Sequence, residues 1–75
     1  MMKLYSMDDC PWCVLLKKRL DYADVKYEEV KDSAIIEAKG FKTVPQLEIT
    51  TGNILDFNKA IIWINEMVQA DLGVQ

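Results

Sequence analysis

The stretch Cys10-Pro11-Trp12-Cys13 constrains this chain more than any other feature. The two cysteines are separated by two residues, and the 75-residue sequence contains no others. A short apolar run precedes the pair and an amphipathic pattern follows it, so the pair is expected at the start of a helix. Pro11 suits the first helical turn, where its missing N–H costs nothing. This layout predicts a redox-active dithiol.

The roles of the two cysteines follow from their places on that helix. Exchange with a disulfide needs a thiolate, and the ordinary pKa of a cysteine is about 8.5. The sequence has no histidine to act as base, so the helix N-terminus is the remaining device that stabilises the anion. Cys10 lies at that end and should be exposed, whereas Cys13 shares a face with Leu16 and Leu20. We therefore expect Cys10 to be the nucleophile and Cys13 the resolving thiol.

A metal site is the main alternative reading of such a pair. Zinc takes four ligands, and this chain has neither a histidine nor a third cysteine. We therefore predict no metal site within one chain. The carboxylates of Asp8 and Asp9 oppose a thiolate at Cys10, so we expect this thiol to be only moderately acidic.

The rest of the sequence predicts an α/β domain. Alternating runs predict strands, and amphipathic runs beside capping residues predict helices. The first half should contain a strand at 3–7, a helix at 11–23, a strand at 25–30, and a short helix that is capped by Asp32 or Ser33 and ends near 39. Two strands, 46–50 and 53–55, should follow around a tight turn at 51–53. The last helix should be capped by Asp56 or Asn58 and end near 70, with residues 71–75 frayed. This β-α-β-α-β-β-α order gives a four-stranded mixed sheet with helices on both faces, which is thioredoxin-like when Cys-X-X-Cys occupies the first strand-to-helix junction. We expect one domain, 1–75.

Composition excludes several classes of partner. Nine basic and twelve acidic side chains give a net charge of −3 without a basic cluster, so no nucleic acid is expected. The longest apolar run, 60–64, is far short of the roughly 20 residues that span a bilayer, so we expect no membrane partner. The first residues show no signal-peptide core. We therefore expect a cytoplasmic monomer, and in that compartment a Cys-X-X-Cys pair is catalytic or metal-binding.

A second motif strengthens this interpretation. Pro45 follows a loop and begins a strand, where it can carry a cis peptide bond that turns the backbone of Val44 toward the dithiol. The combination of Cys10-Pro11-Trp12-Cys13 with Gly40 and Thr43-Val44-Pro45-Gln46 resembles the glutaredoxin family, in its small viral or bacterial dithiol form. The resemblance covers nearly the whole chain. It implies a thioredoxin fold, a cis Pro45, and glutathione as reductant and co-substrate, with no tightly bound cofactor.

The resemblance also implies a glutathione groove. It would be formed by Trp12, Thr43, Val44 and Pro45, together with Phe57 and Asn58 at the start of the last helix. Two departures from the family's pattern affect this groove.

Glutaredoxins usually carry Gly-Gly and an acidic residue where this chain has Leu55-Asp56-Phe57-Asn58. The amides of Phe57 and Asn58 can still bind a carboxylate, but the charge of Asp56 opposes an anion. A lysine commonly stands where Met7 is found, and Lys39 and Lys42 are the candidates to replace it.

The predicted function is that of a glutathione-dependent thiol–disulfide oxidoreductase acting on protein disulfides or glutathione mixed disulfides. Lacking Gly-Gly, the chain also resembles glutaredoxin-like electron donors of ribonucleotide reductase, which are reduced by thioredoxin reductase. A non-enzymatic iron–sulfur carrier is the second alternative. Trp12 is expected to contact substrate, although it can also be a plain surface aromatic. Pro11 supports the helix start, and Lys17 is either an ordinary paired lysine or a residue that tunes the thiols.

Overall fold

A computed structural model shows the arrangement of residues 2–72, with side chains described up to residue 68. The elements follow the predicted order. They are β1 (Met2–Tyr5), α1 (Pro11–Tyr22), β2 (Tyr27–Val30), α2 (Ser33–Ala38), β3 (Gln46–Glu48), β4 (Ile54–Leu55) and α3 (Phe57–Leu72). Every strand is shorter than predicted, whereas α3 continues two residues beyond its predicted end. The expected fraying of 71–75 is thus wrong for 71 and 72, and residues 73–75 lie outside the described part.

The sheet is mixed, as predicted, with the strand order β2-β1-β3-β4. β1 pairs in parallel with β2 and antiparallel with β3, and β4 closes the hairpin with β3. Leu4 lies opposite Glu29 on one side and Leu47 on the other. Because side chains alternate along a strand, these residues share one face of the sheet.

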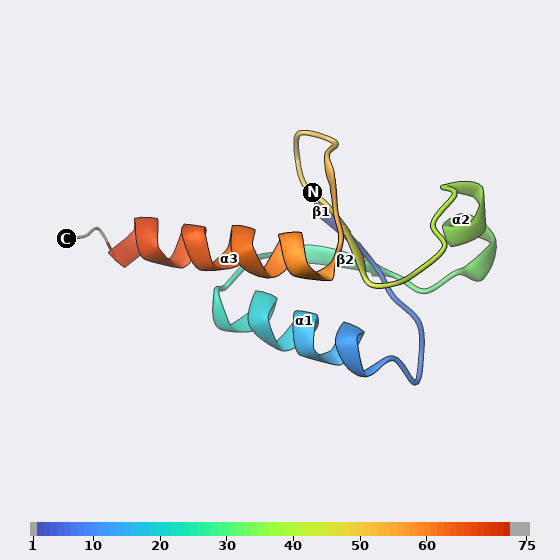
Figure 1. Cartoon of the computed structure of the whole chain (residues 1–75), viewed down its shortest axis with the longest axis horizontal. Helices are drawn as coiled ribbons and strands as arrows, with labels where there is room; N and C mark the ends of the chain where they lie inside the picture. The colour runs from blue at the N-terminus through green and yellow to red at the C-terminus, as the bar shows by residue number, and fades with distance from the viewer. Residues whose placement is uncertain (1, 73–75) are drawn as a thin grey trace.

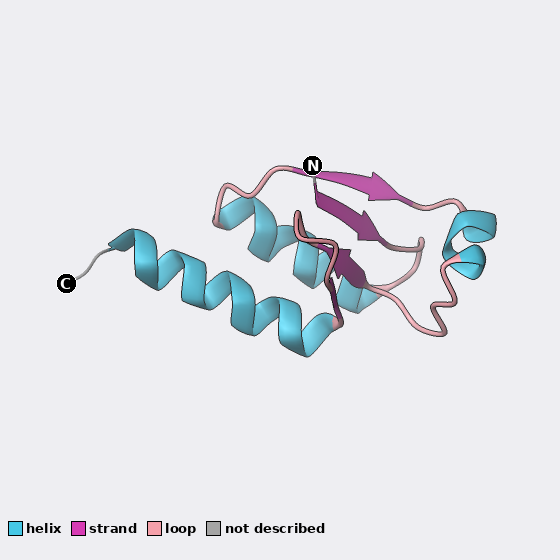
Figure 2. Ribbon diagram, turned by 90° about the horizontal axis from the view of Figure 1, so that it is seen from above, coloured by secondary structure: helices cyan, strands magenta, loops and turns pink. Residues whose placement is uncertain are grey.

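The two long helices cover that face. α1 and α3 lie side by side beneath the strands and begin at the same end of the molecule (Figures 1 and 2). The core between helices and sheet contains Leu4, Leu16, Leu20, Val25, Leu47, Ala60 and Ile64, all buried. Leu16 and Leu20 of α1 lie on the face that the sequence predicted to be buried. Ala60 and Ile64 form the buried face of α3, whereas Ile62 is 57% exposed.

On the opposite face of the sheet, the segment that begins with α2 contacts the end of β1. The ring of Tyr5, 1% exposed, contacts Phe41 edge to face at 5.0 Å between ring centroids. The ammonium group of Lys39 lies over the same ring. α2 itself lies beyond the ends of the strands (Figure 2). This segment leads directly into Val44 and Pro45, so its packing on Tyr5 helps to place them.

Local chemistry explains where the elements end. Asp32 caps α2 by accepting a hydrogen bond from the Ala34 amide at 2.9 Å. Gly40 follows α2 with φ +80°, and Gly52 forms the hairpin turn with φ +92°; a side chain would be strained at both positions. Asp56 caps α3 by accepting from the Lys59 amide at 2.9 Å, which settles the choice between Asp56 and Asn58. No helix within residues 2–72 combines the length and apolarity needed to cross a bilayer.

The core makes a direct prediction about stability. Leu47→Ala removes a fully buried side chain on the face of the sheet that α1 and α3 cover. The substitution should lower the free energy of unfolding by about 2–5 kcal/mol. Leu15→Ala, at a position that is 48% exposed, is the matched control and should change it by less than about 0.5 kcal/mol. Urea denaturation followed by circular dichroism measures both. Equal effects would contradict the described core.

Candidate functional site

The dithiol sits at the N-terminus of α1. Cys10 is the N-cap residue, in extended conformation, and its Sγ accepts a hydrogen bond from the Cys13 amide at 3.1 Å. Pro11 occupies the first helical turn, where its missing N–H leaves no bond unmade. The two cysteines are joined in a disulfide, with Cα atoms 5.2 Å apart. The helix start therefore directs a backbone N–H at the sulfur of Cys10, which is the stabilisation that a thiolate needs.

The two sulfurs differ in access. Cys13 is fully buried, on the face of α1 that joins the core, whereas Cys10 is partly exposed. Only Cys10 can therefore be reached by a large disulfide without movement of the fold. The Sγ of Cys10 lies 4.0 Å from the carbonyl oxygen of Val44. The Val44–Pro45 peptide bond is cis, as predicted.

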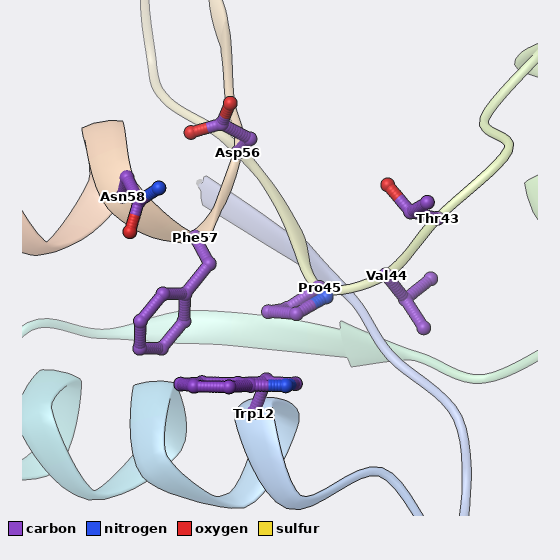
Figure 3. Close-up of a pocket in the computed structure, with 7 residues that line it drawn as sticks. All are labelled: Trp12, Thr43, Val44, Pro45, Asp56, Phe57 and Asn58. Atoms are coloured by element: carbon purple, nitrogen blue, oxygen red, sulfur yellow. The ribbon is translucent and has the colours of Figure 1, made fainter.

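A groove opens beside the dithiol. Its volume is about 320 Å³, and it runs from Thr43, Val44 and Pro45 across the ring of Trp12 to the start of α3 (Figure 3). Trp12 meets Phe57 edge to face, with ring centroids 4.9 Å apart. The lining contains all six residues predicted to bind substrate, Trp12, Thr43, Val44, Pro45, Phe57 and Asn58, together with Asp56. The fold thus gathers residues from three separate parts of the chain into one concave surface.

Asp56 gives the α3 end of the groove its charge. Its carboxylate accepts from the Lys59 amide and so occupies one of the N–H groups at the helix start. Among residues 2–72, no backbone hydrogen bond uses the amides of Phe57 or Asn58. These two N–H groups attract an anion, while the adjacent Asp56 carboxylate repels it.

The structure separates the two candidate lysines. Lys39 pairs with Glu48 at 3.2 Å on the far face of the sheet, and it is engaged with Tyr5 as well. The Tyr5 hydroxyl, which donates to Glu48 at 2.7 Å, and then Lys39 lower the pKa of Glu48. Lys42 instead is exposed beside Thr43 and forms no ion pair among the described residues. Lys42 is therefore the candidate cation at the end of the site formed by Thr43 and Val44.

Lys17 belongs to a partly buried polar network under α1. Its ammonium donates to Oε2 of Glu29 at 2.9 Å, and the hydroxyl of Ser6, which is fully buried, donates to the same oxygen at 2.6 Å. The hydrogen bond from Ser6, followed by that from Lys17, lowers the pKa of Glu29. This network ties the start of the loop before Cys10 to both β2 and α1. No contact between Lys17 and a cysteine sulfur is seen, so a tuning role remains a prediction.

Sequence reasoning missed Ser6 and Glu29, whereas the expected position of Asp56 at the groove is seen in the lining. The signal for Glu29 was available, because alternation places it on the face of Val25 and Tyr27, which packs against α1. Ser6 gave no such signal, since a serine at a strand end is usually solvated. Asp8 is 85% exposed in its side chain and pairs with Lys31 at 3.3 Å, which offsets part of its expected effect on Cys10.

The fold and the helix-capping disulfide define a thioredoxin-like protein with a Cys-X-X-Cys dithiol. Solved structures agree. The thioredoxin-like protein BC3987 is 24% identical with a TM-score of 0.71, covering 89% of this chain and 99% of that one. Glutaredoxin 2 from Salmonella typhimurium, solved in complex with glutathione, is 23% identical with a TM-score of 0.63, over 89% of this chain and 34% of that one. At these identities the likeness establishes the fold alone.

The glutaredoxin family model matches residues 2–53, so the chain belongs to the glutaredoxin family. Glutaredoxin 1 of Rickettsia felis is 36% identical over 55 residues, which are 61% of this chain and 54% of that protein. The chain therefore spans about half the length of the curated relatives it matches. The family match includes Cys10, Cys13 and Val44–Pro45, but it ends before Asp56 and the start of α3. The stretch Leu55-Asp56-Phe57-Asn58, which departs from the family's usual Gly-Gly and acidic residue, thus lies in the part of the groove that the family model does not cover.

The Glu29 network predicts a pH-dependent contribution to stability. Because the pKa of Glu29 is lower in the folded chain, its contribution is present above the ordinary value of 4.5 and is lost as the pH falls through the folded-state pKa. Glu29→Gln should therefore lower the free energy of unfolding by about 1 kcal/mol at neutral pH, and the difference from wild type should shrink as the pH falls below 4.5 and through the folded-state pKa.

Urea titrations across this pH range test the prediction, with Glu28→Gln as the control. Glu28 is exposed on the same strand and forms no hydrogen bond of this kind among the described residues. A constant deficit of Glu29→Gln at all pH values would show that the carboxylate charge is not what stabilises the fold.

Proposed function

We propose that this protein is a glutathione-dependent thiol–disulfide oxidoreductase that reduces protein disulfides or glutathione mixed disulfides. The observation that carries the proposal is the groove beside the Cys10–Cys13 disulfide, which leads from Val44 to the amides at the start of α3. The family membership and the glutathione held by the Salmonella relative support the same substrate.

The reaction follows from the different access of the two sulfurs. The thiolate of Cys10 attacks a client disulfide, forming a new S–S bond while the other client sulfur leaves as a thiolate. The thiol of Cys13 then attacks the sulfur of Cys10, passes its proton to the departing client thiolate, and leaves the disulfide seen here. Two glutathione molecules restore the dithiol and become one molecule of glutathione disulfide. The Val44 backbone would hold the substrate in extended pairing, because no backbone hydrogen bond in residues 2–72 uses its N–H or C=O.

The charge of the groove favours a second candidate. Asp56 lies at the α3 end of the groove, where its charge opposes an anion, and the uncharged Met7 lies in the cavity beyond Val44, where the family usually has a lysine. Both features would suit a dithiol protein reduced by thioredoxin reductase, with ribonucleotide reductase as a possible client class. The electron source is therefore the point that experiment must decide.

The two cysteines should respond differently to substitution. Cys10→Ser should abolish all exchange, because the buried sulfur of Cys13 cannot reach a client. Cys13→Ser should keep release of glutathione from a mixed disulfide, which needs one thiol, and should lose reduction of protein disulfides. Assays with a glutathionylated peptide and with insulin measure the two reactions. Activity retained by Cys10→Ser would overturn the assigned roles.

The reductant should identify the electron source. With glutathione, glutathione reductase and NADPH the protein should turn over a small mixed disulfide, whereas thioredoxin reductase and NADPH should not support turnover. Asp56→Asn keeps an oxygen to cap α3 but removes the charge, and should lower KM for glutathione roughly two- to fivefold.

Lys59→Gln changes a neighbouring exposed charge outside the groove lining and serves as the control. Turnover with thioredoxin reductase alone would support the second candidate. Turnover with neither would favour the cluster carrier, and purified protein would then be checked for iron and colour.

A further inference from the structure

A second cavity lies on the other side of Val44 from the groove. Its volume is about 160 Å³, and its lining is mostly apolar. The residues that line it are Met7, Ile36, Phe41, Lys42, Thr43 and Val44. Since Thr43 and Val44 line both hollows, the two adjoin at the backbone segment that contacts Cys10.

Two of the side chains that line the cavity are held in place by their own packing. Ile36 is 7% exposed on α2, and Phe41 is held against Tyr5 by their ring contact. Met7, in the loop before the dithiol, also lines the cavity and is 50% exposed. An exposed methionine is a flexible apolar surface that adapts to different side chains.

The size and position of the cavity suit one side chain of a bound peptide. A volume of this order is comparable to an apolar cavity of about 150 Å³ that holds a benzene ring. The client sulfur that Cys10 attacks must lie against Sγ of Cys10, which is 4.0 Å from the carbonyl oxygen of Val44 at the edge of the cavity. A residue next to the client cysteine is then within reach of the cavity, because adjacent residues of an extended chain are about 3.3 Å apart.

The charges at the rim complete the description. Asp8 is paired with Lys31, whereas Lys42 has no ion-pair partner among the described residues. Lys42 therefore offers a cation to an acidic group just beyond the apolar side chain. This argues for a peptide over an uncharged small molecule.

We propose that the cavity formed by Met7, Ile36, Phe41 and Val44 binds an apolar side chain next to the attacked cysteine of a protein client. The preferred substrate is thus an extended peptide disulfide with a leucine-like neighbour. This inference rests on the proposed role of Cys10 as nucleophile and does not depend on which reductant restores the dithiol.

The test uses the Cys13→Ser protein, in which the mixed disulfide with Cys10 accumulates. Three short peptides carry one cysteine activated as an aryl disulfide, with leucine before it, leucine after it, or asparagine on both sides. The Cys10 thiolate attacks the peptide sulfur, the protein–peptide bond forms, and the aryl thiolate leaves as a coloured product. One leucine peptide should react about tenfold faster than the asparagine peptide, as expected for burial of one apolar side chain.

Two further variants identify the cavity as the cause. Met7→Gln keeps the length of the side chain but makes it polar, and should remove most of the leucine preference. Ile62→Gln makes the same kind of change at a site that is 57% exposed and lines neither hollow, and should leave the preference intact.

The possible failures are distinct. Equal rates for all three peptides, or a preference that survives Met7→Gln, would overturn the apolar subsite while leaving Cys10 as the nucleophile. No adduct with any peptide would overturn the role of Cys10 and the subsite together. Mass spectrometry of the adduct confirms which protein sulfur reacted.

Discussion

Cys10 caps α1 with its sulfur, and the rest of the site depends on that contact. The hydrogen bond from the Cys13 amide holds the sulfur at the positive end of the helix. The position of this helix end is fixed by Leu16 and Leu20, which are buried against the sheet. Reactivity at the surface and packing in the core are therefore two consequences of one helix, because the same turn that buries Cys13 exposes Cys10.

The loop that faces the dithiol is placed by a different set of contacts. The α2 segment is anchored on Tyr5 through Phe41 and Lys39, and it leads into Val44 and Pro45. The sheet thus supports the site from both faces: one face carries the helix that presents the sulfur, and the other contacts the segment that leads to the Val44 backbone beside it. β1, an inner strand of the sheet, joins the two, because Leu4 packs in the core with α1 and Tyr5 contacts Phe41 on the other face.

The two ends of the groove differ in what they offer a ligand. At α3, free amides and the Asp56 carboxylate act in opposite directions on an anion. Beyond Val44 lie an apolar cavity and Lys42, which has no ion-pair partner among the described residues. Under the proposed function, the charge of Asp56 would act on the binding of glutathione, and the polarity of residue 7 on the binding of a protein client.

The sequence by itself determined the dithiol, the order of elements and the buried face of the first helix, because each depends on local rules of spacing, capping and turn chemistry. The candidate groove residues, Asp56 among them, came from the resemblance to the glutaredoxin family. The sequence could not place Lys39, which pairs on the far face of the sheet, relative to Lys42, which lines the cavity beyond Val44. Nor could it reveal the buried Ser6 bonded to Glu29. These were decided only by the tertiary structure, because strand register and the path of the loop after α2 set which side chains from distant parts of the chain meet.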